Sequence, residues 1–153
     1  KLRDQSKNFF AVGHGDLCFS NILYHKETSL IKLIDPKGAV TEEELYVHPY
    51  YDLAKLSHSI CGRYDFFNNG LYEIKLVRDM KLELELDFDN SEYVKIFKKF
   101  LAENGFDYVT VRLYEASLFL SMLPLHMDNV QKTFGFLLNG MKILDEVEEC
   151  LKD

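Results

Sequence analysis

The pattern of apolar and polar positions divides the chain into a β part and a helical part. Apolar and β-branched residues fill 22–25 and 30–34, and the polar stretch KETS between them predicts a β-hairpin. Apolar residues also alternate twice between Tyr72 and Phe88, which predicts a second hairpin at 72–88. The competing interpretation of that segment is an amphipathic helix through 78–81.

Helical spacing dominates the rest of the chain. We expect helices after Pro49, from about 93 to the stop signal Asn104-Gly105, over 109–123, and over 129–151 with a break near Gly140. The segment 109–123 is apolar on most sides, as a central buried helix would be. The apolar stripes on the other helices predict core packing, including that of Tyr93, Ile96, Phe97, Phe100 and Leu101. The fold class is therefore α+β, mainly helical, as one domain over 1–153.

Composition narrows the function classes. Hydrophobic residues make up 47% and charged residues 28%, which is an ordinary globular balance. The net charge of -7 and the lack of a basic run argue against a nucleic-acid partner. The apolar run at 117–125 is too short to cross a membrane. The three cysteines are odd in number and match no zinc pattern, which predicts reduced thiols and a cytoplasmic location.

Three oxygen-bearing residues surround the first hairpin. Asn21 stands just before its first strand and Asp35 just after the second, so the hairpin brings them to one open end, roughly 5 Å apart. An amide oxygen and a carboxylate suit Mg²⁺, which fills its shell with water and phosphate. Asp16, in the loop before the hairpin, can orient an attacking hydroxyl, and phosphoryl transfer needs mainly such positioning. Each residue alone is a common turn residue, but the combination is more specific.

Three short motifs of the chain resemble those of a known protein family. HGDLCFSN, LIDPKG and HPYYDLAKL closely resemble the aminoglycoside phosphotransferase and choline kinase family, which shares the protein-kinase-like fold. The resemblance implies that Asp16 is the catalytic base, that Asn21 and Asp35 bind magnesium and hence the ATP phosphates, and that His14 shapes the catalytic loop. It also implies that Asp52 is a buried acceptor for backbone N–H groups of that loop. The alternative for Asp52 is the N-cap of a helix over 53–60.

Two departures from the family pattern stand out. Pro-Lys-Gly follows Asp35 in place of the more usual aromatic or Phe-Gly continuation, and His48-Pro49 replaces Asp-Pro. Neither departure removes a ligand. Lys37 could touch a phosphate, but a solvated lysine is the better-supported interpretation.

The resemblance covers a C-terminal lobe only, most specifically 13–56. A nucleotide-clamping N-lobe needs a glycine-rich loop and a strand lysine paired with a helical glutamate. The segment 1–12 is too short for it, and neither G-x-G-x-x-G nor P-loop spacing occurs in the chain. We therefore expect a fragment of a longer protein, completed by an N-lobe or a fused domain and inactive alone.

The expected function is that of a bacterial, ATP- and Mg²⁺-dependent small-molecule kinase. It would transfer the γ-phosphoryl group to a hydroxyl of an aminoglycoside, choline-like or sugar acceptor. The acidic net charge suits a cationic acceptor. The motifs IDPKG and DLAKL, in contrast, are closer to those of a bacterial branch of the family that is linked with surface-polysaccharide synthesis. Two alternatives remain: a non-catalytic kinase-like binding module fused to another enzyme, and a metal-dependent phosphohydrolase. The latter lacks a second histidine cluster.

Overall fold

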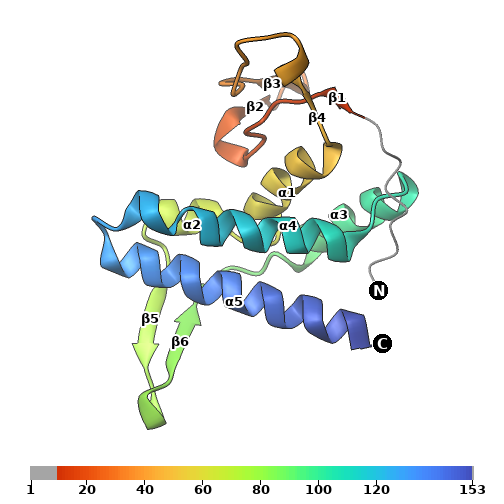
Figure 1. The fold of residues 1–153 in the computed structure, drawn as a ribbon. Helices are drawn as coiled ribbons and strands as arrows, with labels where there is room; N and C mark the ends of the chain where they lie inside the picture. The colour runs from red at the N-terminus through yellow and green to blue at the C-terminus, as the bar shows by residue number, and fades with distance from the viewer. Residues whose placement is uncertain (1–9, 153) are drawn as a thin grey trace.

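The computed structural model of the protein describes residues 10–152 and is a mainly helical α+β fold (Figure 1). The helices and strands confirm the coarse fold class that the sequence predicts. The helices are α1 (Pro49–Ile60), α2 (Tyr64–Asn68), α3 (Ser91–Glu103), α4 (Tyr108–Ser121) and α5 (Val130–Lys152). Among residues 10–152, no helix combines the length and the apolarity that crossing a bilayer requires.

The helix α4 lies at the centre of the helical part. It runs beside α5 and packs against α1 on its other side (Figure 1). Because α4 is apolar on most of its surface, it contributes to both core clusters. One cluster joins α4 to α2 and α5 through Phe67, Ala116, Phe119, Phe136 and Ile143. The other joins α4 to α1 and α3 through Tyr50, Phe97, Leu101 and Val111.

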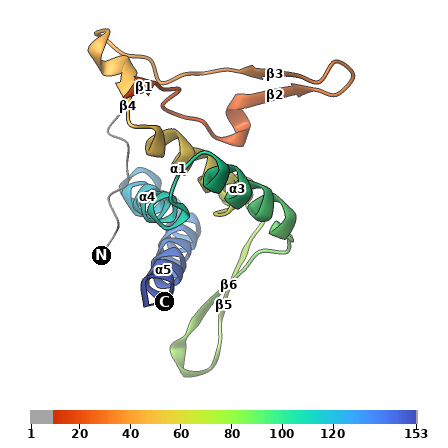
Figure 2. The ribbon, with the colours of Figure 1, turned by 90° about the vertical axis from the view of Figure 1, so that its right-hand side faces the viewer.

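Three antiparallel strand pairs complete the fold. The predicted first hairpin forms from β2 (Ile22–His25) and β3 (Leu30–Leu33), and the second from β5 (Glu73–Leu76) and β6 (Leu82–Glu85). The third pair joins β1 (Ala11–Val12) to β4 (Tyr46–Val47). The two hairpins project from opposite sides of the helical part (Figure 2). The helical interpretation of 78–81 is wrong, since only a 3₁₀ turn, Arg78–Met80, occurs there.

Two expectations about the helices are also wrong. The helix α5 continues through Gly140 without a break. A Cβ at Gly140 would lie 3.1 Å from the Leu120 side chain, so the glycine serves the close approach of α4 and α5. The apolar stripe of α3 is only partly core: Phe97 and Leu101 are buried, whereas three of its members are exposed, namely Tyr93, Ile96 and Phe100. The stripe is wider than the face that α1 and α4 cover.

Candidate functional site

The loop from His14 to Asn21 leads into β2 and is anchored on α1. Within the loop, the Cys18 N–H donates to the Asp16 carbonyl at 2.9 Å, and the Asn21 N–H donates to the Cys18 carbonyl at 3.0 Å. The Phe19 N–H donates to Oγ of Ser59 on α1 at 3.0 Å. These contacts connect the loop to itself and to α1.

Asp52 makes the main connection between α1 and the loop. Its Oδ2 accepts the His14 N–H at 2.6 Å and its Oδ1 accepts the Gly15 N–H at 2.8 Å. The side chain is half-buried, and hydrogen bonds to an ionised acceptor are stronger than neutral ones. The alternative role of Asp52 as a helix N-cap is wrong, because α1 begins at Pro49. The cap is His48, whose Nδ1 accepts the Tyr50 N–H.

His14 links the loop to the end of β3. Its Nδ1 accepts the Asp16 N–H at 3.3 Å, so the ring proton lies on Nε2, which donates to the Ile34 carbonyl at 3.0 Å. Gly15 follows with a φ of +76°, and a Cβ there would lie 2.7 Å from the Lys37 Cβ. The tight turn therefore requires glycine, and it places Asp16 beside α1.

Asp16 and Asn21 are in direct contact. The Asn21 side-chain amide donates to the Asp16 carbonyl at 2.8 Å and to its carboxylate Oδ2 at 3.0 Å. Asn21 is only 8% exposed, whereas the Asp16 side chain is 41% exposed. The Asp16 carboxylate is therefore exposed to solvent while the Asn21 side chain that bonds it is buried. The amide oxygen of Asn21 takes part in neither bond.

Lys55 is the site residue that the sequence analysis missed. Its ammonium group lies 3.0 Å from Oδ1 of Asp16. Burial alone would lower the pKa of Lys55, but the hydrogen bond to Asp16 and the charge of Asp16 outweigh burial and raise it. Lys55 stands one helical turn after Asp52, on the same face of α1. If Asp52 on α1 is expected to bond the loop, a residue three positions later faces the same loop, and this spacing is the signal that could have identified Lys55.

Asp35 lies at the same end of the hairpin, but its side chain forms no hydrogen bond or ion pair with the other site residues that the structure describes. The register pairs Ile22 with Leu33, and the Ile34 N–H donates to the Asn21 carbonyl at 3.0 Å, so the backbone of Asp35 comes next to that of Asn21. The side chain is exposed, and among the described residues it makes no hydrogen bond to Asn21 or Asp16. Asp35 has a φ of +56°, a left-handed conformation that aspartate adopts more readily than most residues.

The possible metal ligands at this end of the hairpin are the Asp35 carboxylate and the Asn21 amide oxygen, which lie on neighbouring backbone segments. Both are oxygen donors of the kind that Mg²⁺ prefers. Within residues 10–152, no group of three or more His, Cys, Asp or Glu side chains is placed to hold a metal ion. A protein-enclosed metal centre, such as a phosphohydrolase would use, therefore gains no support. An ion bound by two protein oxygens and completed by water and phosphate is compatible with the exposed position of Asp35.

Comparisons with protein-family models, with curated proteins and with solved structures find no match to this chain. The assignment of a function therefore depends on the motifs and on the contacts around Asp16.

Proposed function

We propose that the loop at 14–21, with Asp35, Asp52 and Lys55, is the catalytic part of an ATP- and Mg²⁺-dependent phosphotransferase that acts on a hydroxyl of a small molecule. The observation that carries the proposal is the set of contacts that position Asp16. Its backbone is fixed through Asp52 and its carboxylate is held between the Asn21 amide and the Lys55 ammonium, yet the carboxylate remains accessible. Phosphoryl transfer depends mainly on such positioning.

In this proposal Asp16 orients the acceptor. Each carboxylate oxygen accepts about two hydrogen bonds, so the contacts with Asn21 and Lys55 leave room for an alcohol hydroxyl. Lys55 and Asn21 hold the carboxylate in one orientation, and His14 maintains the loop relative to β3. A Mg²⁺ ion held by Asn21 and Asp35 would neutralise phosphate charge when nucleotide is bound.

The rest of the nucleotide site would come from outside these 153 residues. The chain carries no glycine-rich phosphate loop, so we expect a further lobe or a fused domain to supply it. The acceptor class follows from the resemblance and the charge: an aminoglycoside, a choline-like alcohol or a sugar. The free thiols of Cys18, Cys61 and Cys150 fit a protein of the bacterial cytoplasm.

A second candidate is a non-catalytic binding module with a kinase-like lobe. The observation that favours it is that each oxygen of the Asp16 carboxylate already has a protein partner. The same contacts would serve a loop whose only task is to maintain its shape. The two candidates differ in whether Asp16 is needed for turnover.

The test uses the full-length gene product with its native neighbouring domains. ADP release from Mg²⁺-ATP is measured with an aminoglycoside, choline and a set of monosaccharides, and nucleotide affinity is measured by calorimetry. Asp16→Asn should lower turnover by about 10²–10⁴-fold while Mg²⁺-ATP binding stays nearly unchanged. Asp35→Asn should weaken nucleotide binding and turnover together.

The matched control is Asp145→Asn, which removes an exposed carboxylate on α5. It should change neither quantity. Near-normal turnover of Asp16→Asn would refute the catalytic assignment. A wild-type protein that binds Mg²⁺-ATP but phosphorylates none of these acceptors would favour the binding module.

A further inference from the structure

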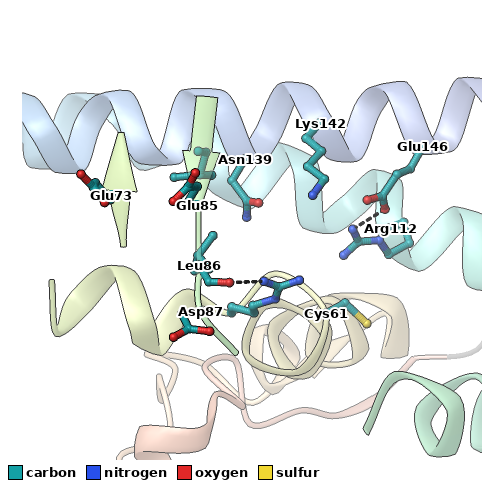
Figure 3. A pocket seen from close by; sticks show the side chains of 11 residues that line it. Cys61, Glu73, Glu85, Leu86, Asp87, Arg112, Asn139, Lys142 and Glu146 are labelled. Atoms are coloured by element: carbon teal, nitrogen blue, oxygen red, sulfur yellow. Dashed lines mark hydrogen bonds and ion pairs between the residues drawn. The ribbon is translucent and has the colours of Figure 1, made fainter. Parts of the chain in front are cut away.

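A cavity of about 650 Å³ lies between the hairpin β5–β6 and the helices α4 and α5, at the C-terminal end of α1 (Figure 3). Its volume is in the range of small-molecule sites. None of its lining residues precedes Cys61, so the loop at 14–21 and Asp35 contribute nothing to it. The cavity is a feature separate from the proposed phosphotransferase site.

A buried arginine forms part of the cavity wall. Arg112 on α4 is only 5% exposed, and its guanidinium bonds to Glu115 through Nη1 at 2.5 Å and to Glu146 through Nη2 at 2.7 Å. Its Nε–H is buried and has no hydrogen-bond partner among the described residues. A buried donor without a partner costs free energy, and an acceptor that reached this N–H would remove that cost.

Two further cations line the same cavity without a carboxylate partner. In the part of the chain that the structure describes, neither Lys142 of α5 nor Arg63 of the α1–α2 connection forms an ion pair. Arg63 makes one long hydrogen bond, 3.4 Å, to the Leu86 carbonyl. Lys142 extends from α5 towards the centre of the cavity (Figure 3). Arg112, Lys142 and Arg63 thus bring cationic N–H donors from three separate segments to one space.

The lining also contains acidic side chains: Glu146 is paired with Arg112 on the cationic side, and Glu73, Glu85 and Asp87 come from the hairpin and the segment after it. Glu73 and Glu85 are paired with Lys75, at 3.5 and 2.6 Å, and they lie on the hairpin side, with Asp87 nearby and Lys142 and Arg112 opposite (Figure 3). Carboxylates accept hydrogen bonds from hydroxyls. Asn139 is placed between the two groups, and its amide N–H donates to the Gly62 carbonyl, so its side-chain oxygen is available as a further acceptor.

We propose that this cavity binds a phosphate monoester of a small polyhydroxylated molecule, of the sugar-phosphate class. The phosphate lies among Arg63, Arg112 and Lys142, because guanidinium and ammonium donors form strong charge-assisted bonds with phosphate. The hydroxyls face Asp87, Asn139 and the hairpin carboxylates. A neutral sugar would leave Arg63 and Lys142 without an anionic partner, and inorganic phosphate would leave the acceptors of the other side unused.

The test is calorimetric titration of the full chain with glucose 1-phosphate, ribose 5-phosphate and glycerol 3-phosphate, beside inorganic phosphate and glucose. At least one ester should bind saturably, about tenfold or more tightly than inorganic phosphate and glucose. Lys142→Gln and Arg63→Gln should each weaken that ester about tenfold. Both residues are at the cavity surface, so these variants keep the buried Arg112–Glu115 pair intact.

The matched control is Lys95→Gln, an exposed lysine on α3 outside the cavity, which should leave the affinity unchanged. The proposal is overturned if no ester binds below about 10 mM, if inorganic phosphate binds as tightly as the esters, or if the cavity variants bind like the control. The variants leave Asp16 and its partners untouched, so the outcome is independent of the phosphotransferase test.

Discussion

Replacing Asp52 with alanine tests whether this carboxylate organises the loop. The structure gives it two hydrogen bonds from loop N–H groups, from His14 at 2.6 Å and from Gly15 at 2.8 Å. A hydrogen bond to a charged group contributes about 1.5–3 kcal/mol to the free energy of unfolding. Because the site is half-buried, water can replace part of each bond. We therefore expect Asp52→Ala to lower the free energy of unfolding by about 2–4 kcal/mol.

The assay is urea denaturation followed by far-UV circular dichroism, which suits a chain without tryptophan. With an m-value of about 2 kcal/mol/M, the midpoint should fall by about 1–2 M. Amide hydrogen exchange supplies a local readout, since the amides of His14 and Gly15 should lose protection in the variant. Asp52→Asn, which keeps one accepting oxygen, should show an intermediate loss of stability.

Asp52 also lies in the first turn of α1, where any carboxylate interacts favourably with the helix dipole. Glu92→Ala is the matched control, because Glu92 is an exposed carboxylate in the first turn of α3. That variant should lose less than about 1 kcal/mol. If Asp52→Ala costs no more than Glu92→Ala, and the two loop amides keep their protection, the organising role of Asp52 is refuted.

Two further predictions concern α1. Lys55→Met should lower the free energy of unfolding at pH 7 by about 1 kcal/mol or less, since the Lys55–Asp16 pair is partly exposed. The pKa of Lys55 is raised above its ordinary 10.5, so this contribution is present below that pH and is lost above it; a difference from wild type that persists at higher pH would contradict the reasoning. His58→Phe should raise stability at pH 7 by about 1 kcal/mol, because both ring nitrogens are buried without a partner in the described part of the chain. Burial, with the charges of Lys55 and Arg112, lowers the pKa of His58 from 6.5 to about 3, so wild type loses stability as the pH falls through that window. Urea unfolding at pH 7 and 4.5 should show a smaller loss for His58→Phe, whereas His25→Gln, at an exposed histidine, should behave like wild type; equal acid sensitivity of His58→Phe and wild type would refute the assignment.

Local sequence patterns were sufficient for most of the secondary structure. Alternation with polar turns predicted both hairpins, and the Asn104-Gly105 signal predicted the end of α3, where Gly105 has a φ of +75°. These features depend on residues close together in the chain. The pattern failed where a neighbouring element decides the outcome: Gly140 reads as a helix breaker, but the close packing of α4 on α5 keeps α5 continuous.

The candidate site shows the same division. The motif HGDLCFSN and the hairpin after it were sufficient to place Asn21 beside Asp16 and the backbone of Asp35 next to that of Asn21, because a short loop and a hairpin connect these positions. The role of Asp52 came from the resemblance, since its loop partners lie 37 and 38 residues away in sequence.

What the sequence by itself determined is thus the local order of elements and the residues that short connections bring together. Only the tertiary structure decided that Lys55 pairs with Asp16 and that Arg112 is buried against Glu115, beside a cavity that also gathers Arg63 and Lys142. The physical reason is that Asp16 and Lys55 lie in a loop and on a helix far apart in the sequence, and that Arg63, Arg112 and Lys142 come from the α1–α2 connection, α4 and α5. From the sequence of its own segment, a charged residue is expected to be exposed to solvent. The packing of the helices decides which charges face one another.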